Sequence, residues 1–153
     1  MKLCTAAMFT LFSFLTFGST CHAGPKDKNK TYFYQPTIVE LNGVMRSKVF
    51  PGRPNYYSIK EGDEAEGGWY LELAKKIDVV VKNHKRSKAF DNQNEKNVKL
   101  IQMVIDWWSP NIKKIKSHFR DGIPVSVKGT LFSAITGHHH TPVVFDVDEM
   151  KIK

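Results

Sequence analysis

Three consecutive histidines, His138, His139 and His140, are the residues of this sequence best suited to chemistry. In an extended segment His138 and His140 would point to one side and His139 to the other. Two imidazoles so placed can bind zinc or copper if a third ligand is near. The nearest acidic residues that could supply it are Asp146, Asp148 and Glu149. The alternative, which we favour, is that the imidazoles fix a loop by hydrogen bonding to the backbone, so that no cofactor is bound.

A hydrolytic site is a weaker possibility, in which His138, Asp63 and Glu64 would meet in space. General acid–base catalysis needs a histidine or carboxylate within hydrogen-bond reach of the reacting group. The sequence has none of the motifs that mark serine hydrolases, zinc proteases, phosphate-binding loops or dinucleotide sites. We therefore expect no catalytic residues and place an enzyme third, behind a binding protein and a metal-binding protein.

Arg53, Tyr56 and Tyr57 lie in a stretch rich in turn-forming residues and are candidates for contact with a ligand or partner. Exposed aromatic rings can stack on a sugar or a base, although aromatic residues are more often part of a core. For Trp107 and Trp108, which come just before a predicted helix, we expect core packing.

A hydrophilic stretch over residues 82–97 reads as an exposed hairpin loop. It carries four cations close together, Lys82, Lys85, Arg86 and Lys88. Such a group can contact an anionic partner, and the alternative is a loop that is simply solvated.

The charge of the chain also favours an anionic partner. The formal net charge is +8, and it falls to +7 if residues 1–23, whose one charged residue is Lys2, are removed. An envelope component or an acidic protein face would be attracted to such a surface. Export argues against nucleic acid. The alternative is a basic surface that only keeps the protein in solution.

Residues 1–23 have the pattern of a removable signal peptide: a positive start, an apolar run and small residues up to Ala23. We expect an exported protein, periplasmic or secreted, with no transmembrane segment in the mature chain. A lipoprotein anchored through Cys21 is less favoured, because Gly18 stands where such signals carry a branched apolar residue. Both cysteines, Cys4 and Cys21, lie in this segment, so the mature chain must fold without disulfides.

Alternating apolar and polar residues predict a single mainly β domain over 37–153, after a flexible basic leader over 24–36. We expect five strands, over 38–50, 69–81, 98–105, 125–135 and 143–152. Gly43 and Gly129 interrupt the first and fourth of them, which indicates a bulge or a sharp bend. Start and stop residues predict a helix over 110–120, between strands three and four.

Three strands, a helix and two strands is the element order of the OB-fold, a five-stranded Greek-key barrel. Glycine bends suit strands that must curl to close a small barrel. The alternative is another small α+β domain with the same order. OB-folds bind ligands across strands two and three, between the one–two and four–five loops. Here these loops are 51–68 and 136–142, which would place the tyrosines and the histidines at neighbouring edges of one face.

The C-terminal strands carry a family resemblance. From Val125 the sequence reads V-x-V-x-G-x-L-F, followed by T-G-H-H-H-T at 136–141 and an apolar strand. It resembles an uncharacterised family of small exported bacterial domains, some of them fused to lysozyme-inhibitor-like modules. The stretch FPGRPNYYSI, at 50–59, is similar to the upstream segment of that family, and the resemblance covers 38–152. The resemblance implies a periplasmic domain that acts against or alongside cell-wall enzymes. The family has no established activity that could be assigned to this chain.

The sequence therefore favours an exported binding module that engages an anionic envelope component or a protein partner, as an inhibitor or accessory of a cell-wall enzyme. The alternative is a periplasmic protein that binds metal through its histidines, and a hydrolytic enzyme comes third.

Overall fold

The computed structural model of the protein describes residues 29–82 and 92–153, which form a mainly β structure, as predicted. The strands are β1 (Lys30–Phe33), β2 (Ile38–Pro51), β3 (Ala65–Val80), β4 (Glu95–Ile105), β5 (Pro124–Ser133) and β6 (Val143–Ile152). Three short helical segments are η1 (Ile59–Glu61), α2 (Pro110–Lys113) and η2 (Lys116–His118). No helix in these residues is long and apolar enough to cross a membrane.

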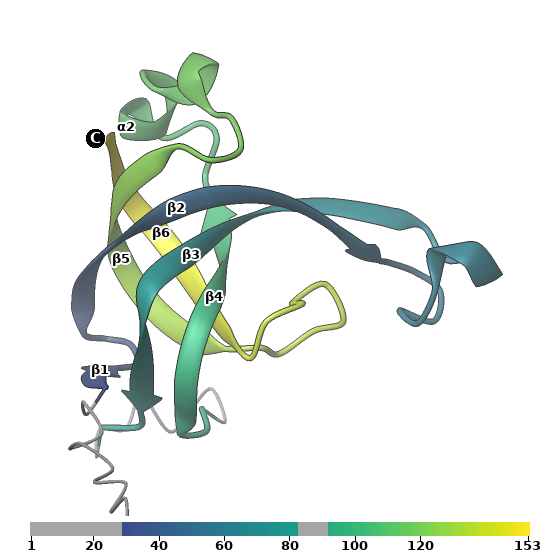
Figure 1. The fold of residues 1–153 in the computed structure, drawn as a ribbon, viewed down its shortest axis with the longest axis horizontal. Coiled ribbons are helices and arrows are strands. Elements are labelled where there is room, and N and C mark those ends of the chain that lie inside the picture. Colours follow the sequence, from purple (N-terminus) through teal and green to yellow (C-terminus); the bar gives the residue numbers. More distant parts are fainter. Residues whose placement is uncertain (1–28, 83–91) are drawn as a thin grey trace, which may run out of the picture.

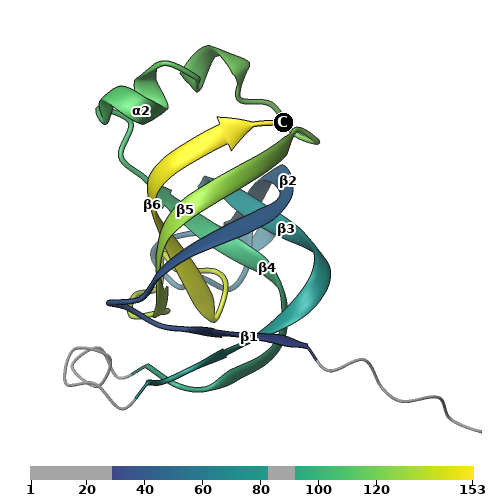
Figure 2. The same cartoon turned by 90° about the vertical axis from the view of Figure 1, so that its left-hand side faces the viewer.

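The five long strands pair in a cycle that returns to its first member (Figure 1). β3 lies antiparallel between β2 and β4, β4 pairs parallel with β6, and β5 lies antiparallel between β6 and β2. Figure 2 shows the strands wrapping around a common interior. Alternate apolar residues fill it, because successive side chains of a strand point to opposite faces. Its fully buried members include Met45, Leu71, Ile101, Val127 and Phe145.

Gly43 is where β2 changes partner, since it pairs with Leu73 of β3 and with Val125 of β5. A Cβ atom at this position would lie 2.5 Å from the carbonyl oxygen of Glu72 and 2.9 Å from Leu71 Cδ1. The strand can therefore make both pairings only with a glycine here.

Gly129 is the second position at which the backbone of a neighbouring strand lies very close. A Cβ atom there would clash with the carbonyl oxygen of Asp146 in the neighbouring strand. The pairing of β5 with β6 shifts register between Lys128 and Gly129, which is the bulge or irregularity expected from the sequence.

β2 and β3 continue beyond the other strands as a two-stranded arm, seen projecting to the right in Figure 1. Residues 48–51 of β2 pair with residues 65–68 of β3 in this arm, and we call the connection between them, 52–64, the tip. The sequence prediction started this strand at Trp69, four residues late, because Gly67 and Gly68 were read as part of a turn. Pairing with β2 overrides the low strand propensity of glycine here.

The predicted leader, 24–36, is partly folded, which corrects the expected domain boundary. Lys30–Phe33 forms β1, which pairs parallel with residues 77–80 of β3. Tyr34 is completely buried in the core. The folded domain therefore begins before residue 37 and has six strands, not five. Residues 24–28 lie outside the described part of the chain.

The predicted helix over 110–120 is much shorter in the structure. A four-residue α2 is followed by the 3₁₀ turn η2, both between β4 and β5. Phe119 then adopts an extended conformation and packs edge-on to Trp69 and Trp107, with ring centroids 6.0 and 5.3 Å away. The start signal at Pro110 was correct, but α2 ends at Lys113, well before the predicted stop signal at Asp121–Gly122. Trp107 packs against the core as expected, whereas Trp108 is 87% exposed.

Valine substitutions test the two close approaches. Gly43→Val and Gly129→Val should each lower the free energy of unfolding by more than ~1 kcal/mol, the range spanned by strand propensities alone, because the added side chain meets backbone. Gly67→Val is the matched control, since a Cβ atom there has nothing within 4 Å. The measurement is denaturant unfolding, and losses no larger than that of the control would contradict the requirement for glycine.

Candidate functional site

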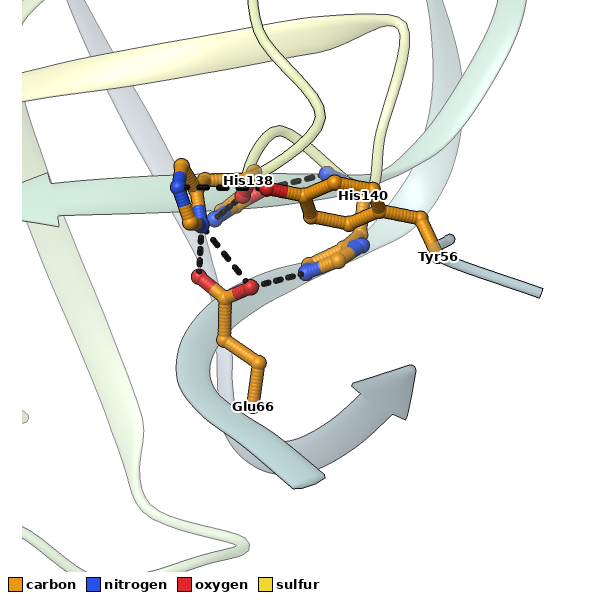
Figure 3. Close-up of polar contacts among 5 residues, drawn as sticks. Tyr56, Glu66, His138 and His140 are labelled. Carbon is orange, nitrogen blue, oxygen red and sulfur yellow. Dashed lines mark hydrogen bonds and ion pairs between the residues drawn. The ribbon is translucent and has the colours of Figure 1, made fainter. Parts of the chain in front are cut away.

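Two connections meet beside the outer surface of β3 and β4. One is the tip of the arm, and the other is the histidine loop, residues 134–142 between β5 and β6. Five residues from these elements contact one another, and we call them the clasp: Tyr56 of the tip, Glu66 of β3, Gln102 of β4, and His138 and His140. Figure 3 shows four of them labelled, with the carboxylate of Glu66 facing both imidazoles.

Glu66 joins the arm to the histidine loop. It lies on the outward-facing side of β3, opposite in parity to the core residue Leu71. Nδ1 of His138 is 2.9 Å from Oε1 and 3.0 Å from Oε2 of this carboxylate. Nε2 of His140 is 3.4 Å from Oε2, an ion-pair separation without hydrogen-bond geometry. A single carboxylate thus holds both imidazoles.

Gln102 fixes the backbone of the same loop. Its side-chain Nε2 donates a hydrogen bond to the carbonyl of His138 (2.8 Å), and its Oε1 accepts one from the backbone N–H of His140 (2.6 Å). Its own backbone N–H donates to Oγ1 of Thr141 (2.8 Å), which in turn donates to the carbonyl of Val143 (2.7 Å). The loop is therefore attached to β4 on both sides of His139.

Tyr56 closes the clasp from the tip. Its ring meets that of His138 edge-on at 5.5 Å, and its hydroxyl lies 3.4 Å from His138 Nε2. The ring also covers Gly137, where a Cβ atom would come within 2.8 Å of it. The glycine before the histidines is thus explained by contact with Tyr56. The next residue, Tyr57, is 84% exposed.

An aromatic layer underlies the clasp. The ring of His140 stacks on Phe50 at 4.8 Å with an interplanar angle of 8°, and Phe50 contacts Tyr70 at 5.3 Å. Tyr70 is fully buried, and its hydroxyl has no hydrogen-bond partner among the described residues. This burial, with the nearby charge of Glu66, raises the pKa of Tyr70 to about 12. The layer gives His140 a rigid apolar support.

His139 makes contacts different from those of its two neighbours, although the segment is a turn, closed by a hydrogen bond from its N–H to the carbonyl of Thr136, and not the extended segment considered from the sequence. Its ring packs edge-on to Phe132 at 5.4 Å, and its Nδ1 accepts a hydrogen bond from the N–H of Ile135 (3.1 Å). Burial, followed by the charges of His138 and His140, lowers the pKa of His139. The ring of His139 is therefore neutral when its Nδ1 accepts this bond, and the bond fixes the start of the histidine loop.

The acidic partner of the histidines differs from the predicted candidates Asp146, Asp148 and Glu149. It is Glu66, while Glu149 instead pairs with Lys128 at 3.1 Å. Within 29–82 and 92–153, no group of three histidine, cysteine, aspartate or glutamate side chains has an arrangement that could hold a metal ion.

Asp63 does not contact His138, which corrects the arrangement considered for a hydrolytic site. Its carboxylate accepts hydrogen bonds from the backbone N–H groups of Tyr57 (2.7 Å), Asn55 (2.9 Å) and Ser58 (2.9 Å). The bond from Ser58 contributes most to holding the pKa of Asp63 below its usual value. Asp63 therefore organises the tip of the arm.

The remaining predicted site residues are dispersed. Arg53 is exposed on the tip. Lys82 is exposed after β3, with its Nζ 5.6 Å from the ring centroid of Phe33 in β1, far along the strand from the clasp. The other three residues of the basic loop, Lys85, Arg86 and Lys88, lie outside the described residues. The structure thus joins Tyr56 to the histidines and leaves Lys82 apart.

Sequence reasoning missed three residues of this region: Phe50, Glu66 and Gln102. Strand parity could have placed Gln102 on the outward-facing side of the sheet, because it alternates with buried neighbours. Glu66 gives no such signal, since the residues on both sides of it are exposed. Strand parity does not predict that the histidine loop covers these side chains.

Comparison with known proteins gives one match. A family described as a domain of unknown function (DUF4431) matches residues 101–151. The matched range contains Gln102 and the histidine loop, but neither Tyr56 nor Glu66. This agrees with the expected resemblance to an uncharacterised family and assigns no activity. No curated protein and no solved structure matches the chain.

The lowered pKa of Asp63 predicts a pH-dependent contribution to stability. A carboxylate whose folded pKa lies below its unfolded value of about 3.9 stabilises the fold above that pH, and the contribution is lost as pH falls through the folded pKa. Asp63→Asn should therefore unfold more easily than the wild type at pH 7, with the difference shrinking below about pH 4.

Denaturant unfolding across this pH range measures the effect. Glu61→Gln, an exposed acid of the same tip, is the control and should leave stability unchanged. A deficit of Asp63→Asn that stays constant down to the lowest pH would contradict a role for the charge.

Proposed function

We propose that the protein is an exported, non-enzymatic binding module built on an OB-fold-like barrel. The pairing cycle supports this, because β2, β3, β4, β6 and β5 follow one another around it in the order of the five OB-fold strands. The helical turn α2 between β4 and β5 stands where that fold has its helix. β1 is then an addition to the barrel.

The binding face we propose is the outer surface of β3 and β4 between the tip and the histidine loop. OB-folds bind ligands between the two equivalent loops. The observation that carries the proposal is the clasp: Tyr56 joins the tip to His138, while Glu66 and Gln102 attach the histidine loop to β3 and β4. Loops fixed in advance lose little conformational entropy on binding, which favours a recognition surface. The histidines then have a structural role.

The proposed partner is an anionic component of the cell envelope. The net charge, +7 without residues 1–23, attracts such a partner over a long range. Arg53 and Tyr57 are exposed beside the clasp, so they can provide a cation and a stacking surface at close range. The acidic face of a cell-wall enzyme would present similar chemistry.

Binding to purified peptidoglycan sacculi, which are anionic polymers, tests this function. We expect cosedimentation that weakens as salt rises from about 0.1 M to 1 M, because the screening length falls from about 10 Å to 3 Å. Arg53→Glu and Tyr57→Ala should each reduce the bound fraction.

The matched controls are Arg120→Glu and Trp108→Ala, which change an exposed cation and an exposed aromatic residue away from the tip. Equal losses in the variants and their controls would reject the proposed face. Absence of binding even at low salt would show that the partner is not an anionic polymer. A protein partner would then be the remaining candidate to test.

Metal binding is the second candidate, on the types of the side chains that meet at Glu66 and not on their arrangement, which among the described residues could not hold a metal ion as it stands. Two imidazoles and a carboxylate are a ligand set that zinc accepts. Nδ1 of His138 and Nε2 of His140 face one carboxylate at 2.9 and 3.4 Å. These are the distances of polar contacts between the side chains themselves, so we place this candidate behind the structural role.

Thermal unfolding with and without zinc separates the two candidates. If the clasp is structural, Gln102→Ala should lower stability by about 1–3 kcal/mol, the cost of leaving the backbone groups of the histidine loop unsatisfied. His140→Ala should lower it too, because its stacking on Phe50 is lost. Zinc should then leave the melting temperature unchanged. If the clasp is a metal site, zinc should raise the wild-type melting temperature, and His138→Ala should abolish that rise. His118→Ala, at an exposed histidine of η2, is the control.

A further inference from the structure

β3 and β4 part where the arm leaves the barrel. Their pairing ends at the pair formed by Trp69 and Met103. Beyond this pair, residues 65–68 of β3 pair with β2, while β4 continues to Ile105 beside β6 (Figure 1). Over residues 65–68, the edge of β3 that faces away from β2 therefore has no partner strand in the described part of the chain.

The backbone of Gly67 points toward this open edge. Along an antiparallel strand, the N–H and C=O groups of successive residues point alternately to one side and the other. Met45 of β2 lies opposite Leu71 of β3. Its N–H and C=O bond away from β3, to the backbone of residues 122 and 123. Leu71, and Gly67 four residues earlier, therefore point away from β2. Gly67 thus offers one donor and one acceptor at the open edge.

A cleft of about 370 Å³ lies at this fork, within the range of small-molecule sites, roughly 300–1,000 Å³. Trp69, Trp107 and Gly67 line it. A Cβ atom on Gly67 would meet no atom within 4 Å beyond its chain neighbours, so the space beside the glycine is open. None of the residues that line the cleft carries a charge. Lys116, with Nζ 5.3 Å from the ring centroid of Trp107, contacts that ring without lining the cleft.

The lining combines aromatic surface with uncharged polar groups. The rings of Trp69 and Trp107 are half-buried, so part of each stays accessible. Phe119 contacts both rings edge-on, at 6.0 and 5.3 Å between centroids, and so holds them in place. Ile105 adds half-buried apolar surface, and the exposed Ser47, opposite Trp69 on β2, adds a hydroxyl group. The cleft therefore suits a neutral ligand with both apolar and polar faces.

The cleft lies mainly on the face of the sheet opposite the clasp. Ser47, Trp69 and Met103 lie opposite one another on three adjacent strands, so their side chains share one face. Trp69 packs against the core, whereas Glu66, at the other parity, faces the histidines. Gln102 is common to the cleft and the clasp.

We propose that this cleft binds an N-acetylated sugar, with its ring against Trp69 and Trp107 and its acetamido group hydrogen-bonded to the backbone of Gly67. A sugar ring is neutral and presents a face of C–H groups that can pack on an aromatic ring. An acetamido group has one N–H and one C=O, which complement the C=O and N–H of one residue at a strand edge.

A sugar suits this edge better than a peptide strand does. The open edge spans four residues, 65–68, and strands usually run to about five or six. One acetamido group needs only a single residue of that edge. The inference does not depend on the function proposed for the clasp, because the ligand is uncharged and the cleft lies mainly on the other face.

Titration with tri-N-acetylchitotriose, a soluble uncharged chain of N-acetylglucosamine, tests the proposal. We expect saturable binding, with shifts of the Gly67 amide and of the indole N–H signals of Trp69 and Trp107 in NMR spectra. Cellotriose has hydroxyl groups in place of the acetamido groups. It should bind at least about tenfold more weakly, because the backbone groups of Gly67 would lose their partners.

Gly67→Val should raise the Kd for chitotriose at least about tenfold, because the new side chain occupies the cleft without meeting other atoms of the fold. Ala74→Val, at an exposed position near the other end of β3, is its control and should bind as the wild type does. Trp107→Leu should also weaken binding. Its control is Trp108→Leu, since Trp108 is 87% exposed and does not line the cleft. Melting temperatures check that the variants fold.

Equal affinity for chitotriose and cellotriose, or an unchanged Kd in Gly67→Val, would overturn the proposal. So would absence of chitotriose binding, or shifts confined to the tip and the histidine loop. Shifts of the Gly67 amide with an alternating valine–threonine peptide, but not with chitotriose, would overturn it in favour of strand addition.

Discussion

The fold depends on β2 pairing with two different strands along its length. This strand of 14 residues pairs with β5 over its first half and with β3 over its second, and the change occurs at Gly43. Neighbouring backbone lies so close there that a side chain would collide with it. Closing the cycle of strands therefore requires β2 and β3 to lie together at one end and apart at the other. The arm is one result, and the separation of β2 from β3 beyond Leu73 is the other.

The parts of the fold that local patterns determine could be predicted from the sequence. Alternation of apolar and polar residues is a property of the strand itself, and it predicted β6 with its observed bounds and β2 within one residue. The elements that were missed depend on distant partners. β1 lies in a lysine-rich stretch and is a strand because β3 runs beside it. The start of β3 contains two glycines, and it is extended because β2 pairs with it.

The candidate site shows the same division at the level of side chains. The histidines stood out because of their type and spacing, and alternation predicted that His139 would face away from the other two. Their carboxylate partner is 72 residues earlier than His138 in the chain, and nothing local connects them. Gln102 is similarly remote, and an isolated glutamine in a strand indicates no function. Choosing between a metal site and a structural clasp needed the geometry of Glu66 and Gln102, which the sequence does not contain.

The distribution of charge gives the two ends of the molecule different roles. On the tip, Arg53 and Lys60 are accompanied by Glu61, Asp63 and Glu64, so its charges nearly cancel. The other end of the molecule, where β1 pairs with β3, carries four lysines: Lys30 in β1, Lys75 and Lys76 in β3, and Lys82 just after β3. Attraction of an anionic polymer over a distance should therefore come mainly from the lysine-rich end, while the tip contributes contacts that act only at close range. An extended polymer can reach both ends at once, and the two contacts would then strengthen each other because the second forms within the same complex.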